Sequence, residues 1–188
     1  MANDLGALTL VLLISFVLIR ARILRQHGIS AIHFGNIDKT DFLIPPFALL
    51  YFYAVFAGAF HWPLFDRGGL VQSPPLAWAG VALCAAGLIL MLWSLVSFGA
   101  SFRVGIDSER PGELVTSGIF AFSRNPIYVA FACILLGEFL IAPQWLLLLY
   151  LAGGVVLFHR QVLREEDYLQ QHYGPEYDAY RQRVRRYL

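Results

Sequence analysis

Three short polar segments in the second half of the chain carry the residues best suited to hold a small charged molecule. The first is Arg124-Asn-Pro-Ile-Tyr128, which runs directly into an apolar stretch. The second contains the adjacent carboxylates Glu165 and Glu166, and the third ends the chain around Arg186. Cations and helix N-termini bind anionic groups, whereas carboxylates accept hydrogen bonds from hydroxyls or take up a proton. The three segments together could therefore bind a ligand that carries both kinds of group.

Asn125 and Pro126 predict the start of a helix. Asn is favoured at the N-cap position because its side chain accepts a hydrogen bond from a free backbone N–H, and Pro at the first helical position has no N–H to leave unpaired. This structural interpretation accounts for the Asn-Pro pair but not for Arg124 or Tyr128. The free N–H groups and the positive dipole end of such a helix would also bind an anionic ligand.

The C-terminal segment predicts two helical pieces. The first continues the fifth apolar segment of the chain as a helix from His159 through Tyr168, and Gly174-Pro175 ends it. The second is amphipathic, with Tyr177 and Tyr180 on one face and four arginines following. Taken alone, the segment could be a solvated helical extension with a basic tail that contacts anionic lipid.

The elements that must position these segments are membrane-spanning helices. The chain is 58% hydrophobic and only 14% charged, with a mean hydropathy of +0.60, whereas a soluble domain has about 25% charged residues. Leu76–Phe98 carries no charge and, as a helix, would be about 34 Å long, enough to cross a hydrocarbon core of roughly 30 Å. The composition excludes a soluble globular enzyme, a disordered chain and a secreted disulfide scaffold.

Five apolar segments predict an all-α fold, a polytopic membrane bundle of about five transmembrane helices that forms a single domain over residues 1–188. The segments are Leu5–Leu24, Phe42–Trp62, Leu76–Phe98, Ile127–Ala142 and Gln144–Phe158. Pro143 alone separates the last two, which predicts a tight helical hairpin. We therefore expect three transmembrane helices in residues 1–98, and a loop, the hairpin and a helical tail in residues 99–188.

The basic residues predict the orientation of this bundle. Thirteen of the fourteen Lys and Arg residues fall in residues 20–41, 99–125 and 159–188, and only Arg67 lies elsewhere. By the positive-inside rule, the N-terminus is outside and the C-terminus is cytoplasmic. The long polar segments 99–125 and 159–188 both fall on the cytoplasmic side, where we expect the active site because long loops in compact proteins are commonly functional.

Other ligand classes find little support. The formal net charge of +1 gives no reason to expect nucleic acid as a partner. Cys84 and Cys133 lie inside apolar segments, which is typical of small core residues rather than of a disulfide or a metal site. The five histidines have no ligand spacing, so we expect no metal.

The order and spacing of the polar motifs resemble the isoprenylcysteine carboxyl methyltransferase and phospholipid methyltransferase superfamily over roughly residues 95–188. The matching segments are Leu114-Val-Thr-Ser-Gly118, Arg124-Asn-Pro-Ile-Tyr128, Arg164-Glu-Glu-Asp-Tyr-Leu169, Tyr173-Gly174, Tyr177-x-x-Tyr180 and Val184-Arg-Arg186. Two positions depart from the superfamily's pattern, because Asn125 stands where His is usual and Arg185 where Pro is usual.

The resemblance implies an integral membrane enzyme that transfers a methyl group from the cofactor S-adenosylmethionine to a lipid-like or prenylated acceptor. It makes residues 99–125 a cofactor-binding loop, and makes Glu166 and Arg186 the candidate catalytic residues on the acceptor side. It assigns cofactor binding to Leu114, Val115, Gly118, Arg124, Asn125, Pro126, Tyr128, Glu165 and Tyr180. Glu165 would accept hydrogen bonds from a ribose, and Arg124 with the helix start would hold a carboxylate. Whether oxygen, nitrogen or sulfur is methylated stays open.

Two other classes of function remain possible from the sequence. A small transporter could use Glu138, the only carboxylate well inside an apolar segment, although its place five residues before Pro143 predicts a position near the outer interface. A transporter would also leave the long loop and tail unexplained. A reductase-like relative that binds a nicotinamide cofactor is the second alternative, although such proteins carry additional helices.

Overall fold

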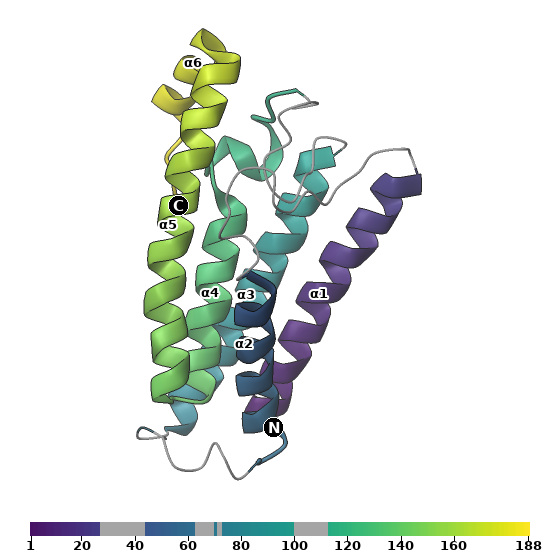
Figure 1. Cartoon of the computed structure of the whole chain (residues 1–188), viewed down its shortest axis with the longest axis vertical. Helices are drawn as coiled ribbons and strands as arrows, with labels where there is room; N and C mark the ends of the chain where they lie inside the picture. Colours follow the sequence, from purple (N-terminus) through teal and green to yellow (C-terminus); the bar gives the residue numbers. More distant parts are fainter. Residues whose placement is uncertain (27–43, 63–69, 71–72, 100–112) are drawn as a thin grey trace.

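The computed structural model describes residues 1–26, 44–62, 70, 73–99 and 113–188. Helices are the regular elements of these ranges (Figure 1). They are α1 (Ala2–Gln26), α2 (Ile44–Ala59), α3 (Pro74–Phe98), the 3-10 helix η3 (Gly118–Ala121), α4 (Pro126–Ile141), α5 (Trp145–Tyr173) and α6 (Pro175–Arg183). The predicted all-α bundle of five apolar helices is confirmed. Residues 42–43 of the second predicted segment and 100–112 of the predicted loop lie outside the described residues.

The helices present an apolar outer surface. Helices α1, α3 and α5 are long and apolar enough to cross a membrane, and α2 and α4 contribute shorter apolar helices. Large side chains such as Ile89, Val96 and Val156 are each 67% exposed. An apolar surface of this extent marks an interface, and helices long enough to cross a membrane make lipid its partner. The chain is an integral membrane protein.

Helices α3 and α4 make the most extensive contact among the described elements, because glycines face one another between them. A Cβ atom on Gly137 would lie 2.5 Å from Cys84 Sγ and 2.8 Å from the carbonyl oxygen of Gly80. A Cβ atom on Gly87 would lie 3.0 Å from the carbonyl oxygen of Ala130. Small residues at a membrane helix interface let the two backbones approach closely, so α3 and α4 form the framework of the bundle.

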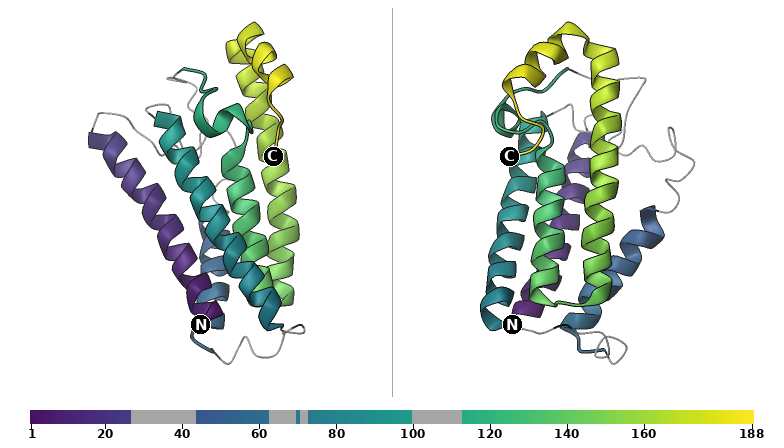
Figure 2. Two further views of the ribbon diagram at one scale, coloured as in Figure 1. Left: turned by 180° about the vertical axis from the view of Figure 1, so that it is seen from behind. Right: turned by 90° about the vertical axis from the view of Figure 1, so that its left-hand side faces the viewer.

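Helix α5 continues well beyond its apolar part, as predicted. The uncharged part of the helix ends at Phe158, and its charged side chains all lie in residues 159–173. Gly174 ends the helix with φ of +50°, a conformation that other residues rarely adopt, and Pro175 begins α6. Helix α6 then reverses direction, so that the C-terminal residues return to the start of α4 (Figure 2).

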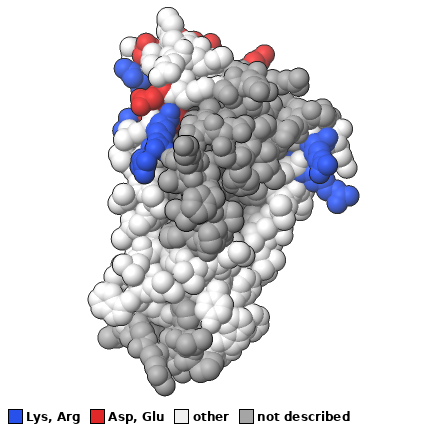
Figure 3. All heavy atoms as spheres, viewed as in Figure 1, with Lys and Arg blue, Asp and Glu red and all other residues white. Residues whose placement is uncertain are grey.

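Most of the charged residues that the structure describes lie at one end of the bundle; Asp4 at the start of α1 and the buried Glu138 are exceptions. In Figure 3, the Lys, Arg, Asp and Glu side chains on the face shown gather at the end where α1 finishes and α6 turns. Arg20 of α1 donates from Nη2 to the carbonyl of Gly99, which follows the last residue of α3. The free carbonyls at a helix C-terminus carry partial negative charge, which favours a cation there. The C-terminal ends of α1 and α3 and the polar tail therefore meet at the same end.

Candidate functional site

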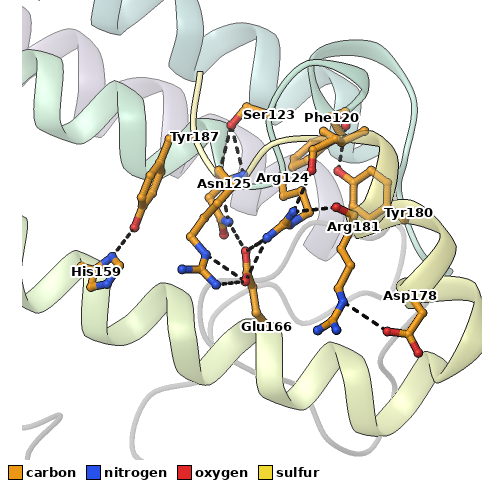
Figure 4. A network of polar contacts seen from close by, with 12 residues as sticks. Phe120, Ser123, Arg124, Asn125, His159, Glu166, Asp178, Tyr180, Arg181 and Tyr187 are labelled. Carbon is orange, nitrogen blue, oxygen red and sulfur yellow. Dashed lines mark hydrogen bonds and ion pairs between the residues drawn. The ribbon is translucent and has the colours of Figure 1, made fainter.

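Glu166 is the centre of a network of charged hydrogen bonds at the polar end of the bundle (Figure 4). Arg124, in the segment before α4, donates from Nε to Glu166 Oε1 at 3.2 Å and from Nη2 to the two carboxylate oxygens at 3.0 and 3.2 Å. The two side chains are only 10% and 11% exposed. This geometry is a buried, bidentate ion pair between a loop and α5.

Asn125 and Arg186 complete the shell around Glu166. The Asn125 amide donates to Oε1 at 2.9 Å, and Arg186 donates from Nε to Oε2 at 3.0 Å. Burial acts to raise the pKa of Glu166, but the hydrogen bond from Arg186 and the charge and hydrogen bonds of Arg124 and Asn125 outweigh it and hold the pKa below its usual value. Glu166 is therefore an ionised carboxylate whose two oxygens both accept charged donors.

Backbone hydrogen bonds join the C-terminal tail to the segment before α4. The Arg124 N–H donates to the Arg185 carbonyl at 2.9 Å, and Ser123 and Arg185 form an isolated parallel β-bridge. The second guanidinium nitrogen of Arg124, Nη1, donates to the carbonyls of Val184 at 2.7 Å and Arg181 at 3.2 Å. Arg124 therefore binds both Glu166 and the tail.

One expectation for Asn125 is wrong. Asn125 is the N-cap residue of α4 and Pro126 follows it at the first helical position, as predicted, but the Asn125 side chain makes no capping hydrogen bond. Its amide instead donates to Glu166 and to the Arg186 carbonyl, the latter at 3.2 Å. The Asn125 side chain is thus turned toward two acceptors, one on α5 and one in the returning tail, and makes no hydrogen bond to the helix start. The first N–H groups of α4 therefore remain free of a side-chain cap.

Glu165 lies in a second polar group, next to the first. Tyr128 of α4 donates its hydroxyl to Glu165 Oε1 at 2.5 Å, and Gln161 donates from Nε2 to the same oxygen at 3.1 Å. On the side of the apolar bundle, Phe158 packs against Tyr128 and Phe131, with ring centroids 5.8 and 5.4 Å apart. Adjacent helical residues point about 100° apart, and Glu165 and Glu166 accordingly contact different partners.

In the described part of the chain, no side-chain hydrogen bond or ion pair joins the remaining predicted cofactor residues to these two groups. Leu114 and Val115 are half-buried, and Gly118 begins η3. Pro126 is buried as the first residue of α4. Tyr180 is buried and donates its hydroxyl to the Phe120 carbonyl at 2.7 Å. A direct ligand role for these residues stays a prediction.

Sequence reasoning missed three contributors to the site. Gln161 precedes Glu165 by four residues, and this helical spacing could have identified it. Ser123 accepts the Asn125 N–H at 3.2 Å, and no sequence signal indicated this contact. His159 Nδ1 lies 2.7 Å from the Tyr187 hydroxyl, a contact between residues 28 positions apart that depends on the reversal at Gly174.

The fold and the site together define a class: an integral membrane helical bundle with an ionised, arginine-clasped carboxylate at its polar end. A sequence model of the phospholipid methyltransferase family matches residues 76–176. The chain belongs to this family. The match begins near the start of α3 and ends at the start of α6, so it contains both glutamates and residues 124–128, whereas Arg186 of the tail lies beyond it.

Curated relatives share part of this region. A protein-S-isoprenylcysteine O-methyltransferase of Schizosaccharomyces pombe is 33% identical over 106 residues, which cover 52% of this chain and 43% of the relative. A relative of the same name from Tribolium castaneum is 27% identical over 119 residues, 62% of this chain and 42% of the relative. A protein-S-isoprenylcysteine O-methyltransferase B of Arabidopsis thaliana is 31% identical over 123 residues, 62% of this chain and 60% of the relative. The chain thus matches between about two and three fifths of each relative's length.

Proposed function

We propose that the chain is an S-adenosylmethionine-dependent methyltransferase and that its acceptor is the carboxylate of a prenylated cysteine. One observation carries the proposal: the free N-terminus of α4, the carboxylates of α5 and Arg186 of the tail converge at the polar end of an apolar bundle. The relatives named as isoprenylcysteine O-methyltransferases support this acceptor class. A lipophilic acceptor also fits a site that opens where helices leave the membrane.

The residues present fit such a methyl donor. Its carboxylate needs free N–H groups or a cation, and the uncapped start of α4 offers the former. Its ribose needs a hydrogen-bond acceptor, which Glu165 provides. Arg124 donates all of its side-chain nitrogens to Glu166 and to tail carbonyls, so we place its role in holding Glu166 and the tail. The bound donor would supply an electrophilic methyl group.

Methyl transfer to a carboxylate requires positioning more than acid–base chemistry. The acceptor already carries the attacking lone pair, so no proton has to be removed. The protein must exclude water and align the two reactants, which can be worth several kcal/mol. In this proposal Arg186 attracts the acceptor carboxylate. Glu166 holds the Arg186 guanidinium in place, with Glu166 Oε2 at 2.9 Å from Arg186 Nη2. A phospholipid amine as acceptor would instead require Glu166 to take up a proton.

We also propose that the polar end of the bundle is cytoplasmic, with the N-terminus outside. The grouping of the charged side chains at that end supports it. A C-terminal reporter should then be active only on the cytoplasmic side of the membrane. Activity on the external side alone would overturn the orientation.

The two alternatives have less support. Glu138, the residue that a transporter would use, is 2% exposed, and its carboxyl oxygen Oε2 lies 2.5 Å from the position of a Cβ on Gly6. Such close packing supports a role in joining α1 to α4. A nicotinamide-dependent reductase is not favoured by the family or by the named relatives.

Two measurements on the purified protein in lipid nanodiscs test the proposal. Calorimetric titration should show binding of S-adenosylmethionine at micromolar concentration, about −8 kcal/mol, and Glu165→Gln and Tyr128→Phe should weaken it. Tritiated methyl groups should then appear on a farnesylated cysteine and not on the same cysteine without its prenyl chain.

The controls test the identity of the acceptor and the class of enzyme separately. A phosphatidylethanolamine substrate tests the amine alternative, and NADPH oxidation tests the reductase. Label on phosphatidylethanolamine alone would overturn the prenylcysteine acceptor, while absence of any binding of the methyl donor would overturn the methyltransferase. Unchanged affinity in both variants would show that the cofactor binds elsewhere.

A further inference from the structure

Gln161 is a polar residue of α5 to which neither the superfamily resemblance nor the proposed reaction gives a task. It precedes Glu165 by four positions, so the two side chains lie on the same face of the helix. The Gln161 amide donates from Nε2 to Glu165 Oε1 at 3.1 Å. The contact lies within the polar extension of α5, at the level where α4 begins.

The second donor to this carboxylate comes from the facing helix. Tyr128 donates its hydroxyl to the same Oε1 atom at 2.5 Å. Donors from two helices thus converge on one oxygen, which fixes the rotation of the carboxyl group and directs the other oxygen, Oε2, away from both of them. Glu166 differs, because guanidinium groups reach both of its oxygens.

We propose that Gln161 is a positioning residue for the methyl donor: with Tyr128, it orients the Glu165 carboxylate so that Oε2 accepts hydrogen bonds from the ribose hydroxyls. The inference rests on the proposed function, since it requires a nucleoside at Glu165. It extends that function to a residue that touches the carboxylate and not the ligand.

The same two hydrogen bonds also favour the ionised form of Glu165. Burial raises the pKa of this carboxyl, and the donors from Tyr128 and Gln161 oppose the rise. Tyr187 of the tail, which is paired with His159, acts on Tyr128, and Glu166 lies at the adjacent position of the helix. Loss of the amide should therefore raise the pKa of Glu165 further.

Gln161→Met tests the role, because it keeps the length of the side chain and removes the amide. Titration of S-adenosylmethionine from about pH 5 to about pH 8 should show affinity lowered about tenfold near pH 7, as expected for a hydrogen bond to a charged group. The acid limb of the binding curve should move to higher pH, and KM for the methyl donor should change more than kcat. Gln171→Met, on an exposed position of the same helix, is the matched control and should bind as the wild type does.

Each outcome decides one question. Wild-type affinity and an unmoved acid limb in Gln161→Met would overturn the positioning role, whatever its effect on thermal stability. Reduced affinity with no pH shift would identify a packing role and would also overturn it. Failure of the wild-type protein itself to bind the methyl donor would instead overturn the proposed function.

Discussion

The Asn125 amide donates to Glu166 at 2.9 Å, although Asn125 occupies the N-cap position of α4. The side chain best suited to close the helix end is thus used to bind a carboxylate 41 residues away. The superfamily pattern that this sequence resembles has His at the same position. Asn and His both carry an N–H donor on a short side chain. Either residue at this position can therefore donate a hydrogen bond to the glutamate.

Asn125→His should therefore be tolerated, whereas Asn125→Leu should not. Leucine leaves Glu166 with one donor fewer and fills the same space with an apolar group, at a cost of about 1 to 3 kcal/mol. Thermal unfolding in detergent measures the difference between the two variants. Equal destabilisation by His and Leu would show that the shape of Asn125, and not its donor, matters.

Glu166→Gln should destabilise the protein by about 3 kcal/mol or more, because it leaves the buried guanidinium of Arg124 without its counter-charge. In a double-mutant cycle with Arg124→Gln, the two losses should not add. Asp167→Asn, at the exposed neighbouring position, is the matched control. Additive losses would contradict a direct ion pair.

The same ion pair predicts a dependence of stability on pH. The pKa of Glu166 is lowered from its ordinary value of 4.5, so the stabilisation is complete above that value and is lost as the pH falls through the lowered pKa. The midpoint of thermal unfolding of the wild type should therefore decrease on acidification below about pH 4.5, and Glu166→Gln should lose less. Parallel acid profiles for the two proteins would refute the assignment.

Arg186→Ala should lower turnover about a hundredfold, roughly 2.7 kcal/mol in the barrier, with little change in affinity for the methyl donor. Among the described contacts, Arg186 is the only one of the four tail arginines whose side chain donates a hydrogen bond to Glu166. Arg183→Ala is the control, because that side chain is exposed and bonds the Ala179 carbonyl one turn earlier. Equal and mild effects of both substitutions would mean that the tail arginines serve only to contact lipid phosphate.

Gly137→Val should destabilise the bundle by about 1 to 3 kcal/mol, because its side chain would collide with Cys84 Sγ and the Gly80 carbonyl of α3. Gly153→Val on α5 is the control, since no other atom lies within 4 Å of a Cβ at that position. Thermal unfolding of the two variants in detergent is the measurement. A harmless valine at position 137 would contradict the close approach of the two helices.

The sequence predicts the helices, because a helix depends on residues that are close together in the chain. Uninterrupted apolar blocks define the helices, and the Pro and Gly residues around these blocks define where they begin and end. The sequence also predicts that the α5 helix is stopped at Gly174-Pro175 and that a second helical piece follows. It cannot predict that the Asn125 amide turns toward Glu166 and the Arg186 carbonyl rather than toward the first N–H groups of α4, since these two acceptors come from distant parts of the chain. The pairing of Arg186 with Glu166 likewise requires the reversal between α5 and α6.

The glycine contacts between α3 and α4 also have a mechanical consequence. Backbones that touch cannot slide without collision, and Ser97 near the end of α3 accepts the Ile119 N–H of η3 at 3.3 Å. Helix α3, η3 and the start of α4 therefore form one stationary wall of the site. On the opposite side, α5 meets this wall through side chains such as the ion pair of Glu166 with Arg124, whereas the reversed tail meets it through backbone contacts between Ser123, Arg124 and Arg185. Any movement of α5 and its tail away from this wall would therefore have to break the contacts of Arg124 first.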